Sequence, residues 1–246
     1  MFDVFANETN IRVRKLPFPH IVVDNVFNKD FYQLMCLEFD ARLRKGFAPK
    51  FNRNKFWKFS HYDAYCWSFD PKKDHAFSDF FYSMPWRRWV NRFFNLNLTK
   101  NMIAEFHHHP PNSAGGYIHN DYDISSFKRE PLANGINAHT HQIDYRGRTP
   151  GADIYCVRSI AILYYFNNHK WQESDGGETA LYTDYKKGSE PVIKVAPHNN
   201  RMLAFEISPK SFHAFLNNKK NVRNSMVQWM HSPEAYVTAR YGESAK

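Results

Sequence analysis

Hydrophobic and polar positions at the start of the chain predict one strand followed by a capped helix. The run FPHIVVDNVF over 18–27 is rich in β-branched residues, which favour a strand. Asn28 is a typical helix N-cap, and the apolar positions after it recur at helical spacing. We therefore expect a helix over 29–44, with its end marked by Gly46.

The aromatic stretch that follows has no clean period. Residues 47–72 are rich in aromatic and basic side chains and predict an irregular hairpin or a cap. Residues 74–95 predict two short helices divided at Pro85, a residue that the first turn of a helix accepts. We expect residues 1–100, approximately, to form a helical support for the rest of the chain.

From about residue 101 the pattern changes to short strands separated by turns. Residues 122–157 interrupt it, because they are polar and show no period; we interpret them as a functional loop or an insertion. The predicted strands lie at 102–109, 158–167, 178–184, 191–196 and 201–207, with two more on either side of a polar loop at 219–220. Such a series closes as a sandwich, a jelly roll or a barrel. The pattern predicts an α+β chain of 246 residues, most simply one domain, with a β core at about 101–232.

Charge narrows the class of protein. The net charge of +9 admits either a basic face for nucleic acid or a basic enzyme that takes an anionic substrate or cosubstrate. Lysine and arginine are spread along the chain, without a helix-turn-helix, RNA-recognition or zinc-finger pattern. Ordinary surface charge is therefore the favoured interpretation, and nucleic acid stays an alternative partner.

Three further features concern the cellular setting. No apolar run approaches the roughly 18 residues of a membrane span, and the N-terminal residues lack the layout of a secretory signal. Cys36, Cys66 and Cys156 are scattered, odd in number and without CxxC spacing, which disfavours a disulfide framework and a zinc site. We expect a reducing, cytoplasmic setting and no membrane partner.

His119 and Asp121 have the spacing of two metal ligands, because side chains two positions apart on an extended segment point to the same side. His213, in a distant predicted strand, adds a second imidazole. Two imidazoles and one carboxylate leave three adjacent positions open, which suits iron(II) that binds an organic chelator and O2 together. This spacing arises often by chance in a chain with 13 histidines. Its meaning depends on the order of the ligands and on Arg223, ten residues after His213.

With these residues in place, the sequence resembles the 2-oxoglutarate- and iron(II)-dependent oxygenases, and among them the prolyl-4-hydroxylase-like branch. The runs FPHIVVDNVF, RSIAILYYFN and NRMLAFEI are similar to strands of that branch. Trp171 and the residues Asp175 to Glu178, which precede TALY, match its GGE turn. The likeness covers most of residues 17–230 and is weakest over 45–100 and 122–157.

The resemblance implies a double-stranded β-helix, the jelly roll of cupins, with N-terminal supporting helices. It implies iron(II) held by His119, Asp121 and His213, with 2-oxoglutarate and O2 as cosubstrates and ascorbate as a further candidate cofactor. The carboxylate of Asp121 argues against a halogenase, in which a small residue at this position opens a halide site.

A cosubstrate seat follows from the same resemblance. Arg223 would hold the distal carboxylate of 2-oxoglutarate with help from the hydroxyl of Ser225, although many members of the branch use lysine here. Tyr117 or Tyr164 would donate a phenol hydroxyl to the same cosubstrate, with core packing as the competing role of each. Trp229 is most simply a core residue.

The implied reaction hydroxylates an unactivated carbon and gives succinate and CO2 as coproducts. Its substrate would be amino-acid-like, peptidyl or a small natural product. The aromatic segment 47–69 and the loop 122–157 are the candidates for the pocket wall or lid, since loops on a rigid scaffold usually carry specificity. Two alternatives stay open: an oxygenase that acts on nucleic acid, and a cupin-like binding module without catalysis.

Other polar residues carry weaker signals. Histidines 107–109 cannot all converge on one metal, because successive strand residues point to opposite faces, and we expect them to be solvated or held in a loop. His139 and His141 could form a second metal site or a substrate contact, but the spacing alone does not favour one. Asp123 fits a loop carboxylate near the ligands. Arg129, Arg146, Arg148 and Arg158 could pair with an anionic substrate, but we expect most of them to be solvated at the surface.

Overall fold

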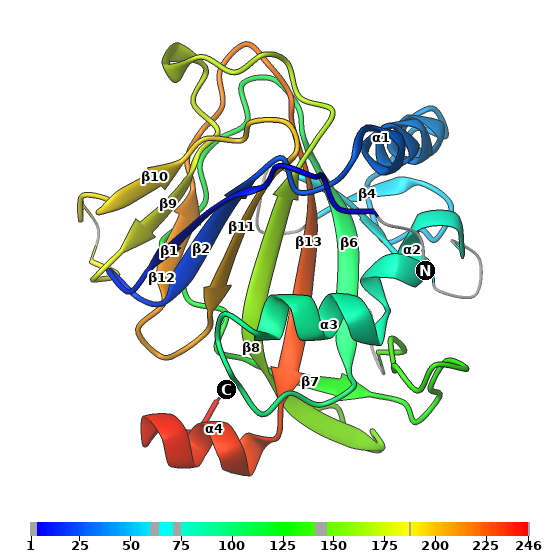
Figure 1. Ribbon diagram of the computed structural model, residues 1–246, viewed down its shortest axis with the longest axis vertical. Helices are drawn as coiled ribbons and strands as arrows, with labels where there is room; N and C mark the ends of the chain where they lie inside the picture. Colours follow the sequence, from blue (N-terminus) through cyan, green and yellow to red (C-terminus); the bar gives the residue numbers. More distant parts are fainter. Residues whose placement is uncertain (1–3, 60–63, 71–74, 141–146, 187, 246) are drawn as a thin grey trace.

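The structure, a computed structural model, describes residues 4–59, 64–70, 75–140, 147–186 and 188–245. Long antiparallel strands form its centre, with helices α1 to α3 on one side and a small group of strands on the other (Figure 1). Both termini lie at the periphery of these layers.

The large sheet has ten strands. Neighbouring strands are antiparallel, except that β3 and β4 are parallel. Its order is β1 (Asn10–Arg14), β2 (His20–Asp24), β11 (Arg201–Glu206), β8 (Ile154–Tyr165), β13 (Arg223–Ser232), β6 (Met102–His109), β5 (Tyr65–Ser68), β4 (Phe56–Lys58) and β3 (Phe47–Ala48), with β7 (Ile124–Phe127) paired to β8.

The small sheet has three antiparallel strands in the order β10 (Ile193–Val195), β9 (Thr179–Tyr182) and β12 (Phe212–Phe215). An isolated bridge between His119 and His213 continues this sheet beyond β12. A 3-10 turn, η1 (Glu173–Asp175), precedes β9. The two sheets together form the predicted jelly roll, a double-stranded β-helix.

Two apolar layers hold the sheets and helices together. The first lies between the large sheet and helices α1 (Lys29–Leu43), α2 (His75–Phe81) and α3 (Met84–Asn91), and it contains Ile162 and Tyr164 of β8. The second lies between the two sheets and contains Ala161 and Tyr165 of the same strand. Because strand side chains alternate, odd-numbered residues of this part of β8 face the space between the sheets.

The predicted helices are confirmed in detail. Asn28 caps α1, since its side-chain oxygen accepts a hydrogen bond of 2.9 Å from the backbone nitrogen of Phe31. Pro85 lies in the first turn of α3, which Ser83 caps. The helix boundaries therefore follow from local capping chemistry.

The N-terminal part and the predicted insertion differ from the expectation. The N-terminal part contributes strands β1 to β5 to the large sheet as well as helices. Residues 122–157 contain β7 and the start of β8, so of their described residues only 122–123, 128–140 and 147–153 lie outside these strands. The ISSF run of β7 is half polar and becomes a strand through its pairing with β8. A C-terminal helix, α4 (Glu234–Tyr241), was not predicted and packs Val237 into the second apolar layer.

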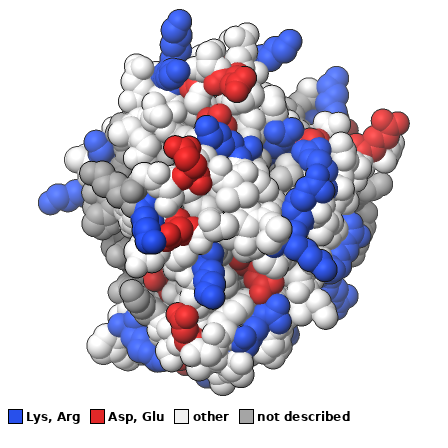
Figure 2. All heavy atoms as spheres, turned by 90° about the vertical axis from the view of Figure 1, so that its left-hand side faces the viewer, with Lys and Arg blue, Asp and Glu red and all other residues white. Residues whose placement is uncertain are grey.

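Among the described residues, no helix is long and apolar enough to cross a membrane. Figure 2 shows lysine and arginine side chains over much of one face, with aspartate and glutamate side chains among them. The mixed charges on this face agree with the spread of basic residues along the sequence.

Candidate active site

The three predicted metal ligands converge between the two sheets. His119, Asp121 and His213 each offer a ligand atom within 4.8 Å of the others. The Nε2 atom of His119 lies 3.7 Å from Asp121 Oδ1, and that of His213 lies 3.8 Å from Asp121 Oδ2. Reciprocal backbone hydrogen bonds of 3.0 and 2.8 Å join His119 to His213, which fixes the two imidazoles side by side.

Both imidazoles are oriented for metal binding. The Nδ1 atom of His119 lies 2.9 Å from the carbonyl oxygen of Tyr117, and that of His213 lies 3.1 Å from the carbonyl oxygen of Ser211. A ring that donates its Nδ1 proton to a carbonyl keeps the Nε2 lone pair for a metal. Two such nitrogens and one carboxylate match the donor set of a facial iron(II) site, so the residues fit the ion.

The carboxylate of Asp121 is held by two residues of the large sheet. Trp229 Nε1 donates a hydrogen bond of 2.7 Å to Asp121 Oδ2, and Arg158 Nη1 lies 3.7 Å from Oδ1. Arg158 is 0% exposed, and its guanidinium carbon lies 4.4 Å from the centroid of the Trp229 ring. Surface solvation, expected for most of the four arginines, is therefore wrong for Arg158, and Trp229 has a polar contact that its place in the core did not suggest.

Arg223 opens β13 and lies almost fully buried, with 3% of its surface exposed. Its Nη1 and Nη2 atoms donate to the hydroxyls of Ser225 and Thr179 at 3.2 and 3.0 Å, and its Nε donates to the carbonyl of Gly177 at 3.2 Å. Burial lowers the pKa of the Arg223 guanidinium from its usual value, because the charged form loses solvation. A buried cation of this kind is stabilised by an anionic ligand.

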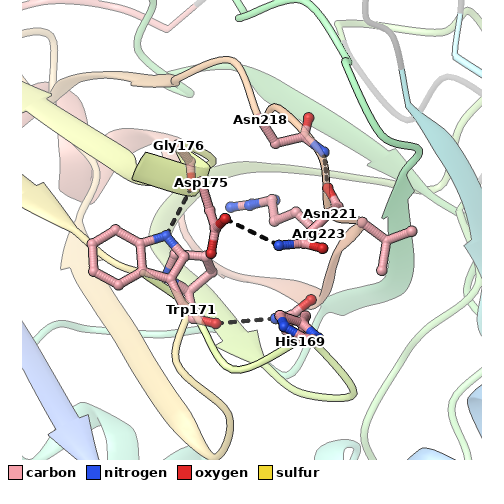
Figure 3. Close-up of a pocket in the computed structure, with 10 residues that line it drawn as sticks. His169, Trp171, Asp175, Gly176, Asn218, Asn221 and Arg223 are labelled. Atoms are coloured by element: carbon pink, nitrogen blue, oxygen red, sulfur yellow. Dashed lines mark hydrogen bonds between the residues drawn. The ribbon is translucent and has the colours of Figure 1, made fainter. Parts of the chain in front are cut away.

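The glycine turn before β9 supports Arg223. Gly176 has φ of +69°, and a Cβ atom there would collide with the carbonyl oxygen of Asn217. Trp171 Nε1 donates to the Gly176 carbonyl at 2.8 Å, and Asn221 donates to Asp175 at 3.0 Å (Figure 3). The GGE turn and the β12–β13 loop are thus hydrogen-bonded to each other beside Arg223.

The metal ligands and Arg223 line one cavity of about 100 Å³. Its polar side chains come from the three ligands, from the Arg223–Thr179 pair and from Glu105, His107 and His109, and Trp229 also borders it. Apolar side chains of Ala161, Leu163, Phe215 and Val227 line the wall between them. The arrangement provides a metal position and an anion seat in the same cavity.

The structure separates the predicted tyrosines from this cavity. Tyr117 is 55% exposed beside His119 and is not among the residues that line the cavity. Tyr164 lies on the helix side of the sheet, where its hydroxyl donates to Asn200 at 2.9 Å, so the structure does not bring it to the site.

The tyrosine beside Arg223 is Tyr165, which sequence reasoning missed. Its hydroxyl donates to Thr179 at 2.8 Å, and its ring centroid lies 5.2 Å from the Arg223 guanidinium carbon. Tyr164 and Tyr165 point to opposite faces of β8, because strand side chains alternate. Both faces are apolar there, so the sequence does not show which face each tyrosine occupies.

The histidine run on β6 is divided between two faces, as alternation requires. His107 and His109 line the cavity, while His108 lies on the other face with Nδ1 2.8 Å from Asn224 Oδ1. The expectation that these histidines are solvated or held in a loop is wrong, because β6 is an inner strand of the large sheet. His107 is bonded to the buried carboxylate of Glu105.

The remaining candidates lie outside the site. His139 Nδ1 lies 3.8 Å from Glu130 Oε2, and His141 falls outside the described residues. The carbonyl of Asp123 accepts a hydrogen bond of 3.1 Å from the backbone nitrogen of Arg158, which ties the H-x-D segment to β8.

Comparisons with known proteins agree with this geometry. A model of the 2OG-Fe(II) oxygenase superfamily matches residues 132–231, a range that contains His213 and Arg223 and begins after Asp121. Prolyl 3,4-dihydroxylase OGFOD1 from Ostreococcus tauri is 29% identical over 101 residues. That match covers 38% of this chain and 20% of the relative, so the chain matches about one fifth of the length of this curated relative.

Solved prolyl hydroxylases share the fold. A Pseudomonas putida prolyl-4-hydroxylase has a TM-score of 0.56 and 17% identity, with 87% of this chain and 92% of that chain covered. A viral collagen prolyl hydroxylase from Paramecium Bursaria Chlorella virus-1, in complex with 2OG, has a TM-score of 0.55 and 15% identity over 87% and 96% of the two chains. A Trichoplax adhaerens prolyl hydroxylase in complex with a hypoxia inducible factor peptide fragment has a TM-score of 0.56 and 15% identity over 87% and 83%.

The chain is thus similar to the 2OG-Fe(II) oxygenase superfamily over residues 132–231, and it shares its fold with solved prolyl hydroxylases. The predicted double-stranded β-helix is confirmed. The family implies iron(II) as the metal and 2-oxoglutarate and O2 as cosubstrates.

Proposed function

We propose that this chain is a 2-oxoglutarate-dependent dioxygenase that hydroxylates an unactivated carbon and releases succinate and CO2. The observation that carries the proposal is the shared cavity: the His119–Asp121–His213 cluster and the buried cation of Arg223 open into the same space. A binding module without catalysis has no need of an open metal face beside an anion seat. Residues 1–246 act in this proposal as one oxygenase domain.

The chain's own residues would have distinct roles. His119, Asp121 and His213 would hold iron(II), which when bound supplies the activation of O2 and the oxidation of the substrate carbon. Trp229 and Arg158 orient the carboxylate ligand through their contacts with its two oxygens.

Arg223 would bind the distal carboxylate of 2-oxoglutarate. Its guanidinium provides parallel N–H donors that suit a carboxylate. Its Nη1 and Nη2 atoms already donate hydrogen bonds to the hydroxyls of Ser225 and Thr179. The apolar wall of Ala161, Leu163 and Val227 would keep bulk water from the carbon chain of the cosubstrate. The burial of Arg223 strengthens the interaction, because the charge is poorly screened there.

For the substrate we propose a peptidyl proline or a related small cyclic or amino-acid side chain. The relative in Ostreococcus tauri is a prolyl 3,4-dihydroxylase, and the Trichoplax adhaerens structure contains a peptide fragment. Phe59 and Ala64, from the aromatic segment predicted to form the pocket wall, line the cavity here. Within the described parts of 122–157, no residue is among those lining it, so this loop is the weaker candidate for the wall.

Succinate formation tests the proposal. The protein is supplied with iron(II), 2-oxoglutarate and O2, and peptides containing proline, free amino acids and oligonucleotides are compared. Succinate should rise with the proline peptides, the product should gain one oxygen atom, and His213→Ala should abolish both. Stimulation by oligonucleotides alone, together with strongly salt-dependent binding to them, would support the nucleic-acid alternative.

A further inference from the structure

A second cluster of metal-ligating side chains lies in the wall of the same cavity. Cys66 of β5 is directly opposite His107 of β6, and Glu105 lies two residues before His107 on β6. All three side chains therefore project from the same face of the sheet. Each offers a ligand atom, Sγ, a carboxylate oxygen or an imidazole nitrogen, within 4.8 Å of the other two.

Burial distinguishes this cluster from an ordinary surface group. Cys66 and Glu105 are both 0% exposed, and Glu105 and His107 line the cavity. Charges buried in proteins are paired or coordinate metals. Here the carboxylate of Glu105 is hydrogen-bonded to His107 Nε2, so a cation that enters from the cavity would contact both groups.

We propose that Cys66, Glu105 and His107 form a second divalent-cation site, and that its ion is zinc. Sulfur, imidazole nitrogen and carboxylate oxygen are the three donors that zinc takes in proteins. Three protein ligands would leave a fourth position for a water or a substrate group. Glu105 and His107 line the cavity, so this position would be reached from it.

The two clusters differ in their chemical preference. The His119–Asp121–His213 cluster has no sulfur donor, whereas a thiolate selects zinc over a hard cation. The Cys66 thiol lies beside the carboxylate of Glu105, and a bound cation stabilises both groups in their ionised forms. The spacing of the cysteines along the sequence disfavoured a zinc site. That spacing could not reveal this cluster, because its ligands come from two paired strands, β5 and β6.

The site is adjacent to the proposed cosubstrate seat. His107 pairs with Ser225 across β6 and β13, and Ser225 accepts a hydrogen bond from Arg223. Glu105 pairs with Val227 in the apolar wall. The second ion would thus lie next to the cavity without sharing a ligand with the first cluster, and its binding does not depend on oxygenase activity.

Cobalt(II) titration of the whole chain separates the two sites. A cysteine thiolate bound to cobalt gives a near-ultraviolet charge-transfer band, and the His119–Asp121–His213 cluster has no sulfur to produce one. We expect two cobalt ions per chain, one for each cluster, with this band present. Cys66→Ser should bind one ion without the band, whereas His213→Ala should bind one ion and keep it.

Cys36→Ser is the matched control. Cys36 lies on α1, packed against the helix-side apolar layer, and its loss should change neither the stoichiometry nor the band. Absence of the band in the wild-type chain, or its persistence in Cys66→Ser, would overturn the proposal.

X-ray absorption at the zinc edge provides a second measurement that needs no variant. The wild-type chain loaded with one zinc ion per chain should show a sulfur neighbour at about 2.3 Å with nitrogen and oxygen neighbours. A shell of nitrogen and oxygen alone would contradict the site even if Cys66→Ser failed to fold.

Discussion

The indole nitrogen of Trp229 donates a hydrogen bond of 2.7 Å to the Oδ2 atom of Asp121. This contact ties the H-x-D segment to β13, the same strand that begins with Arg223. One face of β13 carries every second residue of the strand: Arg223, Ser225, Val227 and Trp229. A single strand therefore spans the site from the anion seat to the carboxylate ligand. The geometry between the metal position and the cosubstrate seat is therefore built into one rigid element.

Trp229→Phe should weaken iron(II) binding by about 10- to 100-fold, which is the usual effect of losing a partner of a metal ligand. The ring volume is largely kept, but the hydrogen bond to Asp121 is lost. An anaerobic iron(II) titration measures the change. Trp86→Phe is the control, because Trp86 also loses a buried bond, to Gln228, but on the helix side of the sheet. Equal iron affinities in both variants would contradict the role of Trp229.

Arg223→Ala should raise the 2-oxoglutarate concentration needed for half-maximal turnover by about 10- to 100-fold, since a hydrogen bond to a charged group is worth roughly 1.5–3 kcal/mol. Iron binding should be unaffected. Arg201→Ala removes another arginine of the same sheet, one paired with Asp24 away from the cavity, and should leave the cosubstrate requirement unchanged. Kinetics over a range of 2-oxoglutarate concentrations distinguishes the two variants.

Gly176→Ala should weaken cosubstrate binding through the turn beside Arg223. The new Cβ collides with the Asn217 carbonyl, so the turn and the loop behind Arg223 must separate. Gly46→Ala is the matched control: Gly46 also has a positive φ, of +82°, but no atom lies within 4 Å of an added Cβ. Gly46→Ala should lose about 1 kcal/mol of stability through backbone strain, and Gly176→Ala should lose more, because the collision adds to the strain. Only Gly176→Ala should also raise the 2-oxoglutarate requirement; a similar rise in Gly46→Ala would refute the specific role of the turn.

His231 should make folding sensitive to acid. Burial lowers the pKa of His231 to about 3, with a further contribution from the charge of Arg158, whereas an unfolded histidine titrates near 6.5. The unfolded state takes up the proton first, so the stabilising effect is complete above about pH 6.5 and is lost as the pH falls toward about 3. The loss is up to roughly 1.4 kcal/mol per pH unit in this window.

His231→Gln isolates this contribution from that of the other histidines. Glutamine can keep polar contacts with Asn101 and Ser125, the partners of the two ring nitrogens. Urea denaturation between pH 4 and 7 should show a shallower pH dependence of the unfolding free energy in the variant. Parallel curves for wild type and variant would contradict the assignment.

Local signals in the sequence predicted the parts of the fold that local chemistry determines. The Asn28 cap, the division at Pro85 and the strand of β6 are confirmed. The order of His119, Asp121, His213 and Arg223 along the chain was enough to predict that they meet, because a known fold arranges them so. Contacts made only through pairing between distant strands were not predictable in this way.

Arg158 and Tyr165 illustrate the limit. An arginine at the start of RSIAILYYFN looks like a solvated strand end, but β8 continues four residues before it and buries the guanidinium against Trp229. The choice between Tyr164 and Tyr165 depends on which face of β8 meets the small sheet, and apolar residues on both faces conceal this. The cluster of Cys66, Glu105 and His107 likewise exists only because β5 pairs with β6.

The central claim is that one cavity binds iron(II) and 2-oxoglutarate together, and anaerobic visible spectroscopy tests it most directly. Adding 2-oxoglutarate to the iron(II)-loaded protein should produce a weak charge-transfer band that requires both components. The band should vanish in His213→Ala and should need more 2-oxoglutarate in Arg223→Ala. Folded, iron-loaded wild-type protein that gives no such band at any 2-oxoglutarate concentration would contradict the account.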